Sequence, residues 1–186
     1  MPSSHTKCLL IREGNRIFQH LNVELENMGT YLEAERQCQA TFQTCSAVFH
    51  AYTSGKEMPI LFTNEQDLTF AMNVIAAAAF LFMDSSRIIA FALMNNHLHF
   101  IITGRESDIE GFFNYILKKL KTSIPEAGRM ALSLKPIEDL AAMRNNIVYT
   151  NRNGFVANPG HTPFSYPWGT GRYYFKCHGV KAFWAK

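Results

Sequence analysis

The stretch from Arg87 to Ile102 places two histidines, His97 and His99, inside an apolar and β-branched run. Such a run is typical of a buried strand, whose side chains alternate between two faces. His97 and His99 therefore point the same way, about 6.6 Å apart along the backbone, while Leu98 packs on the other face. Two imidazoles so placed can bind one divalent cation, although histidine pairs of this kind are also common as structural residues.

The 186 residues suffice for one domain, or for one domain with an appendage. The net charge of +3 permits nucleic acid as a partner without requiring it, because binding depends on clustered charge. The cysteines form no C-x-x-C pair, which predicts free thiols in a reducing compartment. We find no signal-peptide pattern, and the apolar run over 71–83 is too short to span a bilayer. We therefore expect a cytoplasmic protein that does not enter a membrane. The four cysteines are Cys8, Cys38, Cys45 and Cys177.

Hydrophobic periodicity predicts alternating strands and helices. The helix opened by Ser107 is the clearest of these, because its apolar residues recur at helical spacing and define one buried face. That face comprises Ile109, Phe112, Phe113, Ile116, Leu117 and Leu120. The other expected elements are a helix over 18–40, a strand over 47–53, a helix capped by Thr63 that runs to about Asp84, and a helix that starts at Pro136–Asp139 and is stopped by Gly154.

Tyr149 and Asn153 are spaced i, i+4 on the last of these helices and so share a face. A phenol attacks phosphate poorly unless a cation stabilises the phenolate or polarises the phosphate. Asn153 could give an oxygen ligand to such a cation. A packed tyrosine with a capping asparagine is the structural alternative. Tyr115 is a rival nucleophile, because it too lies on a helix after the histidine strand, but it has no amide or acid at i+4.

Three short motifs follow one another along the chain: MNNHLH at 94–99, YTNRNG at 149–154 and SYPW at 165–168. Their order resembles the single-tyrosine transposases of the HUH superfamily, of the insertion-sequence type, and especially the REP-associated tyrosine transposases. Those proteins carry Met-Pro-Asn-His-hydrophobic-His, then Tyr-Ile-x-x-Asn-Pro, then an aromatic-Trp segment. The resemblance covers roughly residues 46–175. It implies an α+β fold in which a central antiparallel sheet is flanked by helices, in the ferredoxin-like HUH endonuclease arrangement.

Carried over position by position, the resemblance implies that His97, His99 and Asn153 bind the metal. It implies that Tyr149 attacks a backbone phosphorus of single-stranded DNA, forming a 5′-phosphotyrosine and freeing a 3′-hydroxyl. Mg²⁺ or Mn²⁺ would serve as the cofactor, and the imidazoles favour Mn²⁺.

The resemblance also divides the chain into an N-terminal helical extension of unknown role (1–44), an HUH tyrosine transposase domain (45–176) and a C-terminal tail (177–186). The partner it implies is single-stranded DNA with hairpins, bound by a monomer or a homodimer. The chain departs from the family pattern at Asn95 and Gly154, which replace two prolines without removing a reacting group.

Basic and aromatic side chains are available to contact the phosphates and bases of DNA. Arg152 is the first candidate because the proposed catalytic residues flank it, whereas three lysines at the end of the helix opened by Ser107 also suit a solvated face. The residues expected to bind DNA are Arg152, Lys118, Lys119, Lys121, Trp168 and Arg172.

Three functions stay open on the sequence alone. The first is a DNA transposase or nickase-ligase that acts by tyrosine transesterification. The second is a domesticated, catalytically silent protein of the same fold that binds DNA hairpins. The third is an unrelated metal hydrolase that uses His97 and His99, with His50 on a neighbouring strand. Covalent capture of DNA separates the first from the other two.

Overall fold

The computed structural model describes residues 47–158 and 160–174. The predicted N-terminal extension (1–44) with its helix over 18–40, the four cysteines and the predicted tail (177–186) lie outside these residues. The described residues carry all three motifs.

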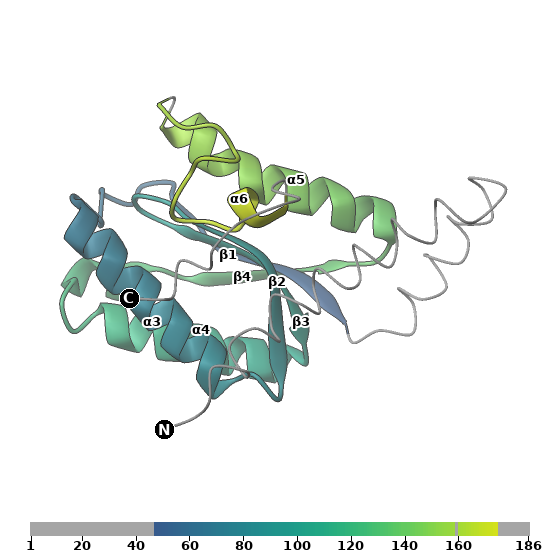
Figure 1. The fold of residues 1–186 in the computed structure, drawn as a ribbon. Coiled ribbons are helices and arrows are strands. Elements are labelled where there is room, and N and C mark those ends of the chain that lie inside the picture. The colour runs from purple at the N-terminus through teal and green to yellow at the C-terminus, as the bar shows by residue number, and fades with distance from the viewer. Residues whose placement is uncertain (1–46, 159, 175–186) are drawn as a thin grey trace, which may run out of the picture.

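Four strands form one sheet in the order β2-β3-β1-β4, and every pair of neighbours is antiparallel. The fold is α+β, because the sheet is antiparallel, and helices flank it on both faces (Figure 1). The predicted strand over 47–53 is confirmed as β1. The four strands are β1 (Val48–Thr53), β2 (Ser86–Leu93), β3 (Leu98–Gly104) and β4 (Leu132–Ile137).

The single strand predicted from Arg87 to Ile102 is wrong, because this stretch is a hairpin of β2 and β3. Leu93 pairs with Leu98, and the N–H of Met94 donates to the carbonyl of His97 at 2.9 Å. Two asparagines, at 95 and 96, form the turn, a position that suits this residue type. His97 thus ends the turn and His99 lies inside β3.

The helix predicted to start at Pro136 begins only at Leu140, since residues 132–137 form β4. Proline lacks a backbone N–H, and within sheets it is found mainly on edge strands. β4 is such an edge, because it pairs only with β1. The side chain of Asp139 caps the helix by accepting from the N–H of Ala142 at 2.7 Å.

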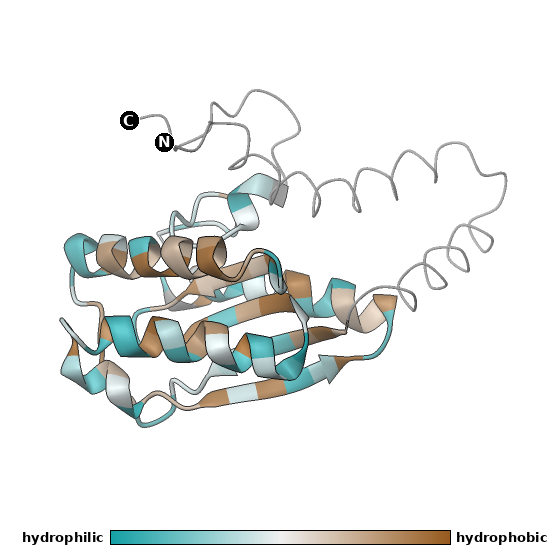
Figure 2. Cartoon of the chain, turned by 90° about the horizontal axis from the view of Figure 1, so that it is seen from below, coloured by the Kyte–Doolittle hydropathy of each residue, from teal (hydrophilic) through white to brown (hydrophobic). Residues whose placement is uncertain are grey.

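Two helices, α3 (Glu65–Leu81) and α4 (Glu106–Leu120), cover one face of the sheet (Figure 1). Figure 2 looks from their side and shows hydrophobic and hydrophilic residues alternating along both helices. The predicted buried face of α4 is confirmed except for Leu117, which is only partly buried. The 3₁₀ helix η2 (Pro125–Arg129) follows α4.

Both of these helices begin at other residues than predicted, since Thr63 is not the N-cap of α3 and Ser107 does not open α4. The N-cap of α3 is Asn64, which accepts from the N–H of Asp67 at 2.9 Å, while Thr63 donates to the carboxylate of Asp67. α4 begins before Ser107, with Arg105 as its N-cap and no side-chain cap. Asp108 instead forms an ion pair with Arg105 at 2.7 Å.

The opposite face of the sheet is covered by α5 (Leu140–Ala157), above a small apolar cluster that includes Ile101, Met143 and Ile147 (Figure 1). Gly154 was expected to stop this helix but lies inside it. A Cβ at Gly154 would overlap the ring of Tyr166, so the glycine allows the following loop to pack directly on the helix. The short α6 (Gly171–Tyr174) ends the described chain.

None of the helices within residues 47–158 and 160–174 is long and apolar enough to cross a membrane.

Candidate functional site

Four rings meet where α5 lies over the sheet, and we call them the histidine–tyrosine cluster. They are His50 of β1, His97 of the hairpin turn, His99 of β3 and Tyr149 of α5. β1 and β3 are neighbours in the sheet, which brings His50 and His99 together although 49 residues separate them. The fold thus assembles the site from three distant parts of the chain.

His97 is held by the hairpin turn and by the loop after β1. Its Nδ1 lies 2.7 Å from Oδ1 of Asn96. The amide nitrogen of Asn96 donates to the carbonyls of Gly55 at 3.1 Å and Met58 at 3.0 Å. A Cβ at Gly55 would lie 2.6 Å from Nδ1 of His97, so the absence of a side chain there makes room for the imidazole.

His99 is more deeply enclosed, with a relative exposure of 5%. Its Nδ1 lies 3.0 Å from Nε2 of His50, and the two rings stack with centroids 5.2 Å apart. The ring of His97 stands nearly perpendicular to that of His99, with 4.9 Å between centroids. The two histidines of the motif are therefore adjacent, as their spacing predicted.

Burial keeps these imidazoles uncharged near neutral pH. It lowers the pKa of His50 to about 4, with help from the positive charge of Lys135 on the paired strand. It lowers the pKa of His99 to about 3, and the neighbouring His97 and His50 lower it further. The pKa of His97 is lowered by the same desolvation. Metal ligation requires neutral imidazole, so the cluster is in the form that can bind a cation.

Tyr149 projects from α5 into this cluster while staying accessible to solvent. Its ring contacts His99 edge-on at 5.6 Å between centroids and His50 at 5.9 Å, yet its relative exposure is 51%. A half-exposed phenol beside buried imidazoles can reach an external phosphate. Tyr115, the rival nucleophile, packs on α4 against the apolar cluster on the other side of the sheet.

Asn153 lies one helical turn beyond Tyr149, and its Nδ2 is buried without a hydrogen-bond partner. The two ends of an amide have the same shape, so a half-turn of the side chain would place Oδ1 at this buried position. The adjacent Gly154 packs on Tyr166, whose hydroxyl donates to the carbonyl of Leu93 at 2.6 Å. This contact places the turn of α5 that carries Asn153 at the hairpin end of the sheet.

The expected DNA-binding residues are not all brought together. Arg152 is exposed on α5, beside the cluster. The three lysines 118, 119 and 121 are exposed at the end of α4, in the layer on the other side of the sheet. Arg172 is partly buried in α6 and lies 5.7 Å from the ring of Tyr173.

Two aromatic residues of the third motif serve the fold. Trp168 is partly buried against the apolar cluster under α3 and α4, and its carbonyl accepts from the N–H of Leu93 at 2.8 Å. Tyr166 is buried, and burial raises its pKa to about 12. His50 entered the sequence analysis only in the hydrolase alternative, and its place on the strand next to that of His99 is confirmed. Its signal was a histidine on a strand, two residues before a tyrosine.

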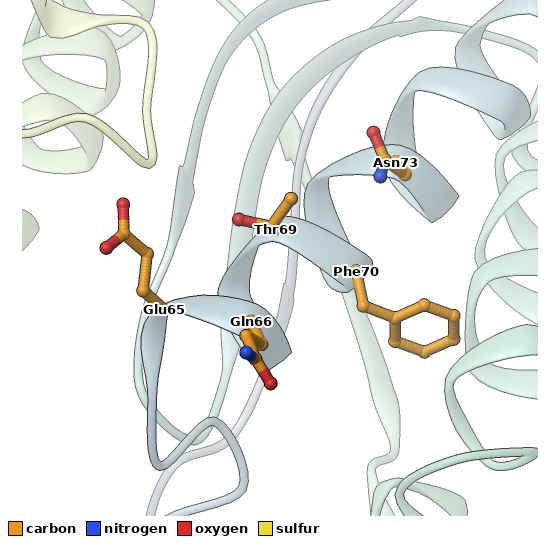
Figure 3. A pocket seen from close by; sticks show the side chains of 5 residues that line it. All are labelled: Glu65, Gln66, Thr69, Phe70 and Asn73. Atoms are coloured by element: carbon orange, nitrogen blue, oxygen red, sulfur yellow. The ribbon is translucent and has the colours of Figure 1, made fainter.

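A shallow surface depression on α3 does not compete with this cluster as a functional site. Its lining residues all belong to α3, and their side chains spread in different directions without converging (Figure 3). The depression also lies in the layer away from the histidine–tyrosine cluster.

The cluster offers a divalent cation two neutral imidazoles, those of His97 and His99. Among residues 47–158 and 160–174, no three His, Cys, Asp or Glu side chains are grouped so as to hold a metal ion. His50 faces His99 through a hydrogen bond, so it does not complete such a group. The protein ligands would then be His97, His99 and the amide oxygen of Asn153. The remaining positions are left for water or phosphate oxygens, which Mg²⁺ and Mn²⁺ accept.

No protein-family model matches this chain, and no curated protein sequence matches it. Among solved structures, a match is the REP-associated tyrosine transposase bound to a REP hairpin. The identity is 17%, the TM-score is 0.49, and the alignment covers 68% of this chain and 76% of that chain. The function of this chain has to be inferred from its own residues.

Proposed function

We propose that this protein cleaves and joins single-stranded DNA by transesterification, with Tyr149 as the nucleophile. The observation that carries the proposal is the position of Tyr149, whose half-exposed ring lies against the buried His99 and His50. In this proposal the histidine pair of the motif, His97 and His99, binds a divalent cation next to this phenol. The order of the three sequence motifs supports the same reading.

In the proposed step, the phenolic oxygen of Tyr149 forms a bond to the phosphorus of a backbone phosphodiester. The bond from phosphorus to the 3′-oxygen breaks, which leaves a 5′-phosphotyrosine and a free 3′-hydroxyl. The phenolic proton passes to solvent, to which Tyr149 is open, and the departing 3′-oxygen takes up a proton from water. Attack by another 3′-hydroxyl reverses the step, so no nucleotide cofactor is needed.

His97, His99 and Asn153 would hold Mg²⁺ or Mn²⁺ in this proposal. When bound, the cation supplies Lewis-acid polarisation of a phosphate oxygen and stabilises the phenolate. The histidines contribute by staying neutral, because burial lowers the pKa of both. Arg152, exposed on the same helix as Tyr149, would contact a flanking phosphate.

The proposed substrate is single-stranded DNA with hairpins, bound by a monomer or a homodimer through a domain spanning residues 45–176. The exposed lysines of α4 would contact only DNA that wraps around to the other layer, so we rank them below Arg152. The silent hairpin binder is less favoured, because a pure binder needs no tyrosine beside a histidine pair. The hydrolase is less favoured because His50 faces His99 through a hydrogen bond.

The test is covalent capture of labelled hairpin DNA taken from the flanks of the gene, with Mn²⁺, resolved on a denaturing gel. We expect a metal-dependent band shifted onto the protein. Tyr149→Phe should abolish the band and leave binding on a native gel nearly unchanged, because only one hydroxyl is lost. Tyr115→Phe is the matched control and should keep the band. A Tyr149→Phe protein that still forms the adduct would exclude Tyr149 as the nucleophile.

A further inference from the structure

The hydrogen bonds behind the two motif histidines form a pattern with few possible proton arrangements. At His97 only one arrangement of protons is possible. The carbonyls of Gly55 and Met58 cannot donate, so the Asn96 atom that faces them must be the amide nitrogen. Oδ1 of Asn96 then faces Nδ1 of His97 at 2.7 Å and can only accept. The neutral ring of His97 therefore carries its proton on Nδ1, which leaves the lone pair on Nε2.

The contact between His50 and His99 allows two arrangements. Nε2 of His50 and Nδ1 of His99 lie 3.0 Å apart, so one of these two nitrogens carries the shared proton. If His50 donates, His99 is protonated on Nε2 and has no lone pair free for a cation. If His99 donates from Nδ1, its Nε2 is free, and His50 acts as an acceptor that fixes the ring orientation.

We propose that Asn96 and His50 are positioning residues that set the tautomers of His97 and His99, so that both rings carry the proton on Nδ1 and leave Nε2 for a divalent cation. Each motif histidine thus has its own partner, one from the hairpin turn and one from the neighbouring strand. The inference rests on the proposed function, because the cation is the reason for the pairing. Asn96 and His50 do not touch the DNA or the cation in this proposal.

The surroundings of both partners suit a fixed orientation. Asn96 makes three hydrogen bonds, two of which tie the hairpin turn to the loop after β1. The same loop is bound a second time, since the N–H groups of Leu61 and Phe62 both donate to the carbonyl of Asn95 at 2.9 Å. His50 has a relative exposure of only 8% and stacks on His99. Asn96 cannot turn without breaking part-buried hydrogen bonds, and His50 cannot turn without breaking a buried one.

The first test is nitrogen-15 NMR of the metal-free full chain near pH 7.5, which distinguishes the two neutral tautomers of each histidine. Signals would be assigned with the single variants His97→Gln and His99→Gln. We expect the Nδ1–H form for both His97 and His99, the opposite of the form that an unconstrained histidine favours. The Nε2–H form at either residue overturns the proposal, whatever the protein does with DNA.

The second test measures Mn²⁺ affinity by electron paramagnetic resonance. His50→Phe keeps the ring but removes the acceptor, and Asn96→Ala removes the acceptor at His97. Each should weaken Mn²⁺ binding by about 10–100-fold, as is typical when a hydrogen-bond partner of a metal ligand is removed. His50→Gln can still accept from Nδ1 of His99 and should restore the affinity to within about threefold. Asn95→Ala, from the same turn, is the matched control and should not change it.

The outcomes separate this proposal from the function on which it rests. Unchanged Mn²⁺ affinity in both His50→Phe and Asn96→Ala, with the folds intact, would overturn the positioning role. A wild-type protein with both Nδ1–H tautomers but no Mn²⁺ binding would instead overturn the metal centre of the proposed function, and the tautomers would stand on the NMR result. If His50→Phe does not fold, the tautomers of the wild type and the Mn²⁺ affinity of Asn96→Ala still decide.

Discussion

The two faces of the sheet are built on different principles. The face under α3 and α4 buries an entirely apolar cluster in which Phe100, Phe112 and Phe113 make edge-to-face ring contacts. The face under α5 holds only a small apolar cluster and places two buried histidines beside a half-exposed tyrosine. Burying polar groups costs free energy unless they are paired. The first face therefore supplies most of the stability, which lets the second hold groups suited to chemistry.

Unpaired atoms sharpen this contrast. The buried side-chain atoms without a hydrogen-bond partner in the described residues are Oγ1 of Thr150, Nδ2 of Asn151 and Nδ2 of Asn153. All three belong to one turn of α5, next to Tyr149. A helix selected only for stability would carry apolar residues there, because each unsatisfied buried group costs about 1–3 kcal/mol. This turn of α5 therefore carries a cost in stability that the apolar face does not.

The largest expected effect is on the apolar face. Phe100→Ala removes a fully buried ring and should lower the free energy of unfolding by about 3–5 kcal/mol, measured by urea denaturation. Tyr149→Phe on the other face should change it by no more than about 0.5 kcal/mol. Equal losses in the two variants would contradict the division between a stabilising face and a functional face.

His97→Ala should change Mn²⁺ binding strongly and the stability of the fold little. Because His97 is only partly buried, we expect its loss to leave the fold intact. The loss of a ligand should weaken Mn²⁺ binding by more than the roughly 10–100-fold attributed to its hydrogen-bond partners. Isothermal titration calorimetry measures the affinity, and circular dichroism checks the fold. Wild-type affinity for Mn²⁺ in this variant would remove His97 from the proposed ligand set.

Gly154→Ala compares packing on α5 with packing on α4. Alanine is favoured over glycine inside a helix by about 1 kcal/mol, but the added Cβ would overlap the Tyr166 ring. Such overpacking costs about 1–3 kcal/mol, so the net effect should be a loss of stability. Gly111→Ala in α4 is the control, because its Cβ would lie 3.1 Å from the ring of Phe82, which has only to give slightly. If Gly154→Ala is the more stable of the two, the contact with Tyr166 does not hold the helix.

Acid should lower the free energy of unfolding through the buried histidines under α5. The unfolded chain returns His50 and His99 to an ordinary pKa near 6.5, whereas burial lowers these pKa values to about 4 and about 3 in the fold. The unfolded state then binds more protons, so stability is complete above pH 6.5 and falls as the pH drops towards 4. Urea midpoints at pH 7.5, 5.5 and 4.5 measure this, and His50→Gln should flatten the profile. A stability that rises with acid over this range would contradict the burial of neutral histidines.

The sequence predicted the apolar side of the fold better than the functional side. The buried face of α4 follows from its 3.6-residue period, and β1 follows from its apolar run. The hairpin was missed because apolar runs lie on both sides of Asn95 and Asn96, so that β2 and β3 together look like one strand. β4 was missed because Pro136 argues against a strand, and only the sheet order shows that β4 is an edge that tolerates it.

The site was predictable only in part, since its members come from distant segments. The adjacency of His97 and His99 follows from local spacing, but no local rule places His50 or Tyr149 beside them. Gly154 was expected to end the helix, and only the packing of Tyr166 explains why a glycine lies within it. Trp168 and Tyr166 look like exposed aromatics in a loop-rich segment. In the fold they help attach that segment to the edge of β2.

The most direct test of the account is to locate the bond between protein and DNA. After reaction with hairpin DNA and Mn²⁺, trypsin would release residues 145–152, a peptide in which Tyr149 is the only tyrosine, whereas Tyr115 lies in the peptide 106–118. We predict that mass spectrometry finds the nucleotide adduct on the peptide 145–152 and only when metal is present. An adduct on the peptide 106–118, or hairpin DNA cleaved without any adduct, would contradict the assignment of chemistry to the α5 face.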